Sequence, residues 1–518
     1  MFYFFFSRII SRMDFIKKHF WLSLSGIGIF ILYFVTRLTN ILSLPIFTDE
    51  AIYIRWSEIA KQDASWRFIS LTDGKQPMFV WIDMVFLKFI HDPLLASRLV
   101  SVGAGFASLL GVIALTYILF KNKWTAILAG FLYVIFPYAL VYDRLAMYDS
   151  LVVTFIIWSL FVEILLVRKQ RLDFAFILAL VIGGGMLTKT NADFAVILLP
   201  FSLLLFDFKK KFVKKKLLKW VGLAIFASVL AYLYYSILRL SPFYHIIGDK
   251  NAVFVYPLGE WLHHPFTFFW GNFHGLSSWF IEYVTIPGII LIVAGFFLGV
   301  KSYWREKLLL LVWFAAPFVG LALFGRVLYP RYILSMVIPL LPLGAYSLVY
   351  VWQHVKRKYI AVAIMILCIA LMIRSDFYII TDFYKAPIAQ ADVNQYANSW
   401  AAGNGVQQSV KFFKEKSQNQ KIYIGTQGTF GLLPFGLEIY LANNPNVTIK
   451  GFWPINDTMP KELQEASKIM PTYVVFYQPC PSCQNTEEPP IAWPVKLLSS
   501  YEQGTSGSHY RIYQVLSQ

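Results

Sequence analysis

Two adjacent carboxylates, Asp49 and Glu50, follow the first long apolar stretch of this 518-residue chain. An ionised side chain is costly in lipid, so such a pair lies either in water or in a polar cavity at the membrane surface. A carboxylate held beside a hydroxyl group can take its proton, which makes Asp49 the best candidate for a general base. The alternative for both residues is a solvated loop at the end of a span.

Three cations stand at comparable places further along the chain. Lys75 precedes Pro77, Lys189 follows one apolar stretch, and Arg331 precedes another. A lysine offers an anion a compact charge and an arginine offers a planar fork, so these residues are candidates to bind a phosphate. Each also has a simpler explanation. The lysines can extend to the membrane surface, and Arg331 can pair with an interfacial carbonyl or a lipid phosphate.

A third polar motif lies in the segment from Tyr142 to Ser150. Asp149 is expected to share the role of base or to position an acceptor, because two nearby carboxylates push their pKa values apart. Arg144, like Tyr53 after the first carboxylate pair, is a candidate to position an acceptor or a donor. Asp143 is expected to be solvated. Carboxylates and cations would thus meet at one face of a membrane.

The composition indicates the class of protein that must position these residues. Hydrophobic residues make up 58% of the chain and charged residues 14%, whereas an average soluble domain has about 25% charged residues. The sequence therefore predicts an all-α polytopic membrane protein. About eleven apolar segments are candidates to cross the bilayer. They lie at 20–44, 94–120, 125–141, 150–167, 172–188, 192–206, 220–240, 281–300, 308–325, 331–351 and 359–379.

The basic residues predict the orientation. They concentrate in alternate loops, and such loops face the cytoplasm. We therefore expect a multi-pass protein of the plasma membrane with a cytoplasmic N-terminus. The loops at 45–93 and 241–280 and the C-terminal tail would then face outward. The net charge of +17 reflects these loops rather than a nucleic-acid partner. The basic groups are Arg8 to Lys18, Lys121 and Lys123, Arg168 to Arg171, Lys209 to Lys219, Lys301 to Lys307, and Lys356 to Lys358.

The first outward loop, 45–93, has the pattern of an ordered element. Aromatic residues interleave with apolar ones over 51–60, as in a short interfacial helix. The segment 78–90 is apolar but too short to span. At the other end of the chain, Met1 to Phe6 is too short an apolar run for a cleavable signal peptide.

The chain divides into a membrane domain, 1–380, and an outward domain, 381–518. Segments 421–425 and 472–477 read as buried strands, and 407–416 and 432–441 as helices, which predicts a small α/β domain. Cys480 and Cys483 lie in this domain. A short-loop disulfide, two free thiols, and metal or redox chemistry are all open for them.

Metal binding has one further candidate segment. His245, His263, His264 and His274 fall in the 241–280 loop, but their spacing matches no ligand pattern. An amphipathic loop that closes over a lipid is the preferred interpretation. We expect no required cofactor, and a divalent metal stays an option without support from ligand spacing.

Four of these motifs, in this order, resemble those of the GT-C membrane glycosyltransferases. The closest branch is the group of protein O-mannosyltransferases and lipid A aminoarabinose transferases, glycosyltransferase family 39-like, and the resemblance covers about residues 20–350. Two positions depart from it: Gln76 stands where Pro is frequent, and Thr190-Asn191 where Gly-Pro is common. The motifs are Thr48 to Tyr53, Lys75-Gln76-Pro77, Arg144 to Asp149, and Leu187-Thr188-Lys189.

The resemblance implies a GT-C-like fold and an inverting transferase. Its donor would be a sugar on a polyprenyl phosphate, and its acceptor a hydroxyl of a protein, lipid or glycan at the outer face. In this reading Asp49, Glu50 and Asp149 form the catalytic set, with Glu50 orienting helices or the acceptor. Lys75, Arg331 and Lys189 would bind the donor phosphate. The alternative functions are a lipid or glycan transporter or flippase, and a non-catalytic scaffold that displays the C-terminal domain.

Overall fold

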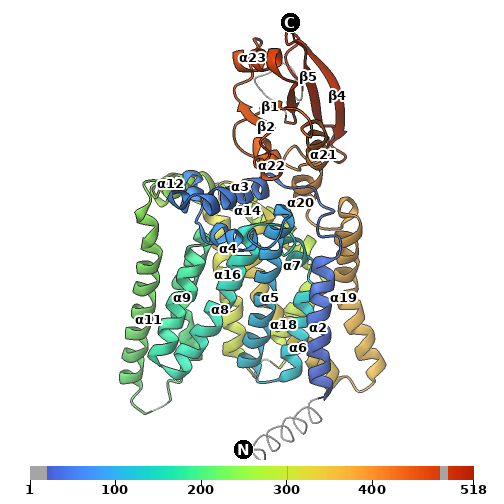
Figure 1. Cartoon of the computed structure of the whole chain (residues 1–518). Coiled ribbons are helices and arrows are strands. Elements are labelled where there is room, and N and C mark those ends of the chain that lie inside the picture. Colours follow the sequence, from blue (N-terminus) through green and yellow to red (C-terminus); the bar gives the residue numbers. More distant parts are fainter. Residues whose placement is uncertain (1–19, 210, 300, 479–487, 518) are drawn as a thin grey trace, which may run out of the picture.

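A bundle of helices carries a small α/β domain at one end (Figure 1). This computed structural model describes residues 20–209, 211–299, 301–478 and 488–517. The predictions for Met1 to Phe6 and for Cys480 and Cys483 fall outside the described residues.

The bundle confirms the predicted all-α membrane domain. Within the described residues, seven helical segments are long and apolar enough to cross a membrane, and a bent pair makes an eighth. The seven are α2 (Phe20–Leu38), α5 (Pro93–Phe120), α8 (Tyr148–Lys169), α11 with η5 (Val213–Leu240), α16 (Trp304–Phe324), the segment Pro330–His354, and α19 (Lys358–Thr381).

Shorter helical segments account for the remaining predicted spans. The helix α6 (Lys123–Val134) ends early, and α7 (Pro137–Tyr142) begins at a proline that has no N–H to continue a helix. The bent pair, α14 (Phe269–Val284) and α15 (Ile286–Phe297), turns by 97°. The other short elements are α9 (Leu172–Met186), η3 (Thr190–Asp193), α10 (Phe194–Leu198) and η4 (Leu199–Leu205). The long segment Pro330–His354 consists of η6 (Pro330–Ile333), α17 (Leu334–Val337), η7 (Ile338–Leu340) and α18 (Leu341–His354).

Short helices cover the end of the bundle below the α/β domain, among them α3, α4 and α12 (Figure 1). The predicted interfacial helices of the first loop are therefore present, and Pro77 caps α4. Chain segments far apart in sequence meet at this end. The elements are α3 (Thr48–Gln62), η1 (Ala64–Trp66), η2 (Ile69–Asp73), α4 (Met78–Phe86), α12 (Ile246–Phe254) and α13 (Leu258–His263).

The C-terminal domain is a five-stranded sheet with strand order β2-β1-β3-β5-β4. The strand β1 pairs in parallel with β2 and β3, whereas β5 pairs antiparallel with β3 and β4. The predicted α/β class is confirmed, although β2, β4, β5 and α23 were not predicted. The elements are α21 (Val406–Lys416), β1 (Ile422–Gln427), α22 (Leu432–Leu441), β2 (Val447–Phe452), α23 (Lys461–Ile469), β3 (Thr472–Phe476), β4 (Val495–Glu502) and β5 (His509–Val515).

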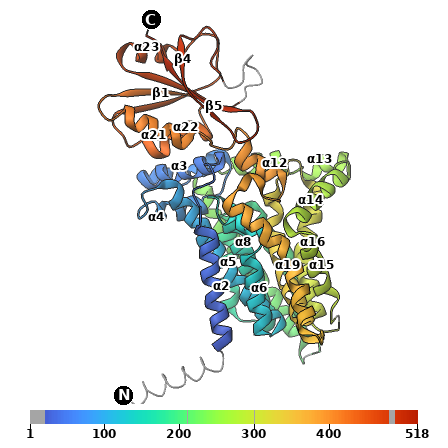
Figure 2. The same cartoon turned by 90° about the vertical axis from the view of Figure 1, so that its right-hand side faces the viewer.

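The C-terminal domain rests on α3 through α22 (Figure 2). Ala51 and Ile54 of α3 join the apolar core of the domain, and Arg55 forms an ion pair with Glu438 of α22 at 2.7 Å. At the start of α3, the backbone N–H of Thr48 donates to the carbonyl of Ala401 at 3.0 Å. The helix that carries Asp49 is thus held by both domains. The connection from α19 to the domain runs through η8 (Phe383–Lys385), α20 (Gln390–Val393) and η9 (Asn394–Asn398).

Candidate active site

Asp49 lies in the first turn of α3 and faces Arg331 of η6. The Arg331 guanidinium donates to the Asp49 carboxylate at 3.0 Å, although 282 residues separate the two in sequence. Burial raises the pKa of Asp49, but the charges of Arg331 and Lys75 more than offset it, so its pKa lies below the ordinary value. Asp49 is therefore a carboxylate at neutral pH, as a proton acceptor must be.

A second ion pair lies beside the first. Lys189 donates to Asp149, in the first turn of α8, at 2.7 Å. The ammonium of Lys189 also stands 4.9 Å from the ring centre of Tyr332, the neighbour of Arg331. Asp49 and Asp149 thus each pair with one of the predicted cations.

Lys75 belongs to the same group but has no acidic partner. It lies between η2 and α4, and no carboxylate of the described residues is within ion-pair distance of it. Burial lowers the pKa of its ammonium, and the nearby charge of Asp49 partly opposes that shift. The ammonium faces the ring of Phe254, on α12, at 5.9 Å. Lys75 is half-buried, and a partly desolvated cation without an ion pair favours an anion beside it.

A backbone feature brings α12 close to Lys75. Gly74 has φ +67°, and a Cβ there would lie 2.6 Å from Cβ of Lys250 and 2.7 Å from the carbonyl oxygen of Ile246. Only glycine adopts this conformation easily and leaves that space. Lys250 itself pairs with Asp73 at 2.6 Å.

Lys75, Lys189 and Lys250 border an open cavity, with ≈ 810 Å³ of empty space when the solvent at its mouth is included. Three lysines face it and no carboxylate is among its lining residues. Lys189 and Lys250 pair with Asp149 and Asp73, and Arg331 pairs with Asp49. The lining consists of Gly74, Lys75, Gln76, Lys189, Thr190, Asn191, Phe194, Lys250, Asn251, Phe254, Val255, Leu321, Tyr332, Ser335 and Met336.

Uncharged polar side chains form another part of the cavity wall. Gln76 donates to the Thr190 hydroxyl at 2.8 Å, and that hydroxyl donates to Asn251 at 3.3 Å. The amide nitrogen of Asn191 reaches the Ser335 hydroxyl at 3.4 Å, while its Oδ1 is buried without a hydrogen-bond partner.

Glu50 occupies a different place from its neighbour Asp49. Its side chain is fully buried and accepts two hydrogen bonds from Arg98, at 2.9 and 2.8 Å. The backbone N–H groups of Phe47 and Ala146 donate to it at 2.9 and 2.7 Å. These contacts join α3 to α5 and to the turn before α8, so they favour a structural role.

Arg144 and Tyr53 also lie away from the cavity lining. Arg144 donates to the carbonyls of Thr36, Thr39 and Asn40 at 2.7 to 2.9 Å, which satisfies the free carbonyls at the end of α2. The ring of Tyr53 packs edge-on against Tyr148 at 4.5 Å, one turn along α3 from Asp49.

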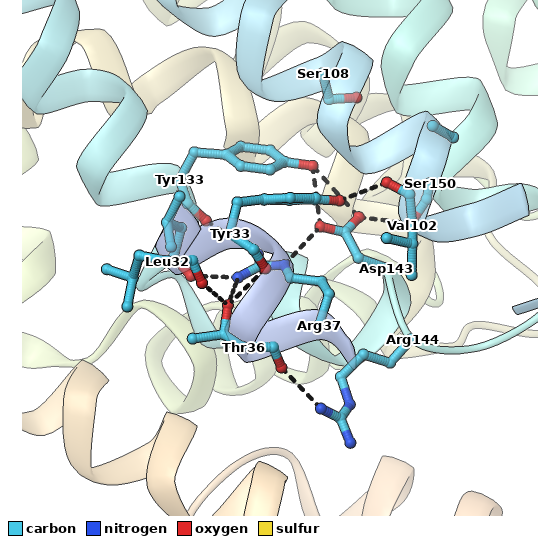
Figure 3. A network of polar contacts seen from close by, with 12 residues as sticks. Leu32, Tyr33, Thr36, Arg37, Val102, Ser108, Tyr133, Asp143, Arg144 and Ser150 are labelled. Atoms are coloured by element: carbon cyan, nitrogen blue, oxygen red, sulfur yellow. Dashed lines mark hydrogen bonds and ion pairs between the residues drawn. The ribbon is translucent and has the colours of Figure 1, made fainter. Parts of the chain in front are cut away.

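The prediction that Asp143 is solvated is wrong. Figure 3 shows its carboxylate inside a polar network, where it meets Arg37 of α2 at 3.3 Å and accepts from Ser150 at 2.9 Å. The phenol of Tyr133 also donates to it at 3.3 Å. The turn before α8 folds inward because these donors replace water. Since Ser150 follows Asp149, the network also fixes the start of α8.

A cluster that the motifs did not reveal lies next to η6, on the side of the linker to the C-terminal domain. Asp392 of α20 is fully buried and accepts from the phenol of Tyr142 at 2.5 Å and from that of Tyr283. Burial raises the pKa of Asp392 to about 6, although both phenols and the charge of Arg331 lower it. Tyr138 stacks on Tyr283 and donates to the carbonyl of Pro330, next to Arg331. No sequence pattern ties this linker to η6.

The histidine loop gives no sign of a metal centre. Among the described residues, no group of three His, Cys, Asp or Glu side chains is placed to hold a metal ion. His264 instead packs edge-on against Tyr256 and Phe268.

Comparisons with known proteins match the chain in sequence and in fold. Residues 74–235 match the family model described as dolichyl-phosphate-mannose-protein mannosyltransferase. The fold is similar to the crystal structure of ArnT from Cupriavidus metallidurans bound to undecaprenyl phosphate, with TM-score 0.57 and 14% identity over 96% of this chain and 98% of ArnT.

A second similar structure is the archaeal oligosaccharyltransferase AglB from Archaeoglobus fulgidus, in complex with an inhibitory peptide and a dolichol-phosphate. Its TM-score is 0.53 and its identity 14%, over 89% of this chain and 69% of AglB. No curated protein matches the chain by sequence.

Proposed function

We propose that this chain, whose GT-C-type fold confirms the resemblance seen in its motifs, transfers a sugar from a polyprenyl phosphate to an acceptor hydroxyl. Three findings support the donor class: the family match over 74–235 and the lipid phosphates bound in the ArnT and AglB structures. The acceptor is a hydroxyl of a protein, lipid or glycan, and the sugar inverts at its anomeric carbon.

The observation that carries this proposal is the ammonium of Lys75. It faces a cavity beside Asp49, and no described carboxylate pairs with it, whereas Lys189, Lys250 and Arg331 each hold one. An ammonium without a paired carboxylate is suited to bind the single negative charge of a sugar phosphodiester. A lipid-linked donor cannot leave the bilayer, so its phosphate needs cations at the depth of the headgroups, where the interfacial helices lie.

The arrangement supports a single displacement. The acceptor O–H bond breaks as its oxygen bonds to the anomeric carbon, and the proton goes to Asp49. The bond from the anomeric carbon to the phosphate oxygen breaks, and its electron pair leaves with the phosphate. Lys75, with Lys189 and Lys250, stabilises that anion. Arg331 orients Asp49, and Asp149 orients Lys189. Attack opposite the departing phosphate inverts the anomeric carbon.

Glu50, Tyr53 and Arg144 act on this site indirectly in the proposal. Glu50 holds α3 against α5 through Arg98. Tyr53 supports the face of α3 that carries Asp49, and Arg144 ties the turn before α8 to the end of α2.

The site and the C-terminal domain are proposed to face outward from the plasma membrane, with the N-terminus in the cytoplasm. The helices run alternately up and down (Figure 1), so the basic loops between α5 and α6, α8 and α9, and before α11 lie at the end opposite the C-terminal domain. Loops rich in lysine and arginine remain in the cytoplasm.

The test is turnover of a donor panel. Purified protein in lipid nanodiscs is mixed with polyprenyl-phosphate sugars and a membrane extract that supplies acceptors, and the release of free polyprenyl phosphate is measured. Wild type should release it from at least one donor, and Asp49→Asn should not, because an amide accepts no proton.

Asp63→Asn, at the exposed end of α3, is the matched control and should behave like wild type. Equal turnover in Asp49→Asn would contradict the role of the base. A donor that crosses the bilayer with its sugar intact would indicate a flippase instead.

A further inference from the structure

We infer that Asp392, in the linker to the C-terminal domain, is a positioning residue of the active site that holds Arg331, and through it the base Asp49, in place. This role rests on the proposed function, because it concerns the alignment of the base in that reaction. Figure 1 shows α20, which carries Asp392, where the C-terminal domain meets the bundle. The linker has contacts on each side of the ion pair between Asp49 and Arg331, and these contacts support the role.

Two tyrosines join Asp392 to the segment that carries Arg331. The phenol of Tyr283, on α14, donates to the Asp392 carboxylate, and its ring stacks on that of Tyr138 with the centres 4.0 Å apart. The hydroxyl of Tyr138 donates to the carbonyl of Pro330, the first residue of η6. Arg331 follows directly in the chain. A displacement of the Asp392 carboxylate is therefore passed on to the guanidinium.

The charge of the Asp392 carboxylate determines how firmly the phenols are held. The side chain is fully buried, and burial raises its pKa to about 6, although Tyr142, Tyr283 and Arg331 lower it. The group is thus ionised above about pH 6 and protonated below it. An ionised acceptor makes hydrogen bonds about twice as strong as a neutral one, so protonation loosens the hold on Tyr283. Among the described residues, the titratable and charged groups that face this carboxyl are Tyr138, Tyr142, Tyr283, Tyr396, Arg331 and Asp149.

The same linker also contacts the start of α3, which carries Asp49. Phe47, at the N-cap of α3, forms an antiparallel backbone bridge with Ala402. The ring of Phe47 packs edge-on against that of Tyr396, with the centres 4.9 Å apart. The base and its cation are thus both held from the linker. Small displacements of reacting groups cost up to about a hundredfold in rate, so this support is expected to act on kcat.

The test measures kcat and the donor KM of wild type and Asp392→Asn between about pH 5 and about pH 8. Wild-type kcat should fall as the pH drops through about 6, and Asp392 is the expected source because the pKa of Asp49 lies below its ordinary value. The amide has the shape of the protonated carboxyl, so kcat of Asp392→Asn should be low and nearly independent of pH. At the alkaline end it should be about tenfold or more below that of wild type. The donor KM should stay close to that of wild type, since Lys75 is unchanged.

Tyr142→Phe distinguishes this role from a merely structural one. The substitution removes one donor from the ionised Asp392 carboxylate and leaves the path through Tyr283 intact. The pKa of Asp392 should rise, so the fall in kcat should move to higher pH by about one unit, the equivalent of one hydrogen bond. The matched control is Asp382→Asn, which removes a surface ion pair with Lys385 from the same linker. It should match wild type at every pH.

The outcomes separate this role from the proposed function. A wild-type kcat that does not fall near pH 6, or one that falls in the same way in Asp392→Asn, would overturn the inference. A fall that stays at the wild-type pH in Tyr142→Phe would overturn it too, and this variant decides the question if Asp392→Asn does not fold. Absence of transfer by wild type at every pH would contradict the proposed function and, with it, the role of Asp392.

Discussion

Removing the ammonium of Lys75 should weaken donor binding and slow transfer. In the structure this group faces the cavity with Phe254 as its described neighbour and no ion pair. Loss of one charge-assisted hydrogen bond costs about 1.5–3 kcal/mol. Since 1.36 kcal/mol corresponds to tenfold, Lys75→Ala should lower affinity and kcat/KM by about ten- to hundredfold.

The assay follows binding of polyprenyl phosphate and transfer in parallel. Lys75→Arg should restore both only in part, because a planar fork does not reproduce a compact ammonium. Lys88→Ala removes an exposed lysine from the same loop and should match wild type. The thermal unfolding midpoint should barely change in Lys75→Ala, since the substitution breaks no ion pair.

Wild-type binding and transfer by Lys75→Ala would refute this reasoning. The donor phosphate would then be held by Lys189, Lys250 or Arg331 instead.

Three further predictions concern stability, pH and orientation. Glu50→Gln leaves Arg98 buried without its counter-charge, so the protein should lose about 3–5 kcal/mol of stability in denaturant unfolding; an unchanged unfolding curve would contradict the structural role. The pKa of Asp49 lies below its ordinary value of 3.8, so protonation of this base should not slow transfer until the pH falls below about 4. The pKa of Lys75 lies below its ordinary value of 10.5, so the KM for the donor should rise on the alkaline side before pH 10.5, and Lys75→Arg should move that rise to higher pH. If the rise stays at the same pH in Lys75→Arg, Lys75 is not its source. A reporter enzyme that works only in the cytoplasm should be silent when fused after Gln518, and a strong signal would show that the C-terminus is cytoplasmic.

The sequence predicted that carboxylates and cations meet at one face of the membrane domain, and in the structure several of them lie together. Asp49, Lys75, Asp149, Lys189 and Arg331 each stand at the end of an apolar segment, and alternating spans bring such ends to the same face. The structure places these five side chains in one group. Charged residues are rare within membrane segments, so the positions of these five residues were enough to predict that their side chains lie at the same face.

The same reasoning could not separate neighbouring residues by direction. Asp49 and Glu50 are adjacent carboxylates, yet one meets Arg331 and the other Arg98, because successive residues of a helix point about 100° apart. Asp143 looked solvated because its partner, Arg37, lies more than 100 residues earlier, within the first span. Such long-range pairs have no local signal.

The C-terminal domain shows a similar limit. The strands β1 and β3 are buried almost throughout and read as apolar runs, whereas β4, at the edge of the sheet, consists only of exposed and half-buried residues. The edge strand therefore resembles a polar loop in sequence. Asp392 was missed for a further reason: its linker enters the membrane domain only in the folded chain.

The most direct test of the proposed donor site is a structure of the protein with polyprenyl phosphate bound. We expect the phosphate in the cavity beside Asp49, within hydrogen-bond distance of the Lys75 ammonium, and the isoprenoid chain leading from there into the bilayer. A phosphate bound at the basic loops of the opposite end, with the cavity left without it, would contradict the proposed site.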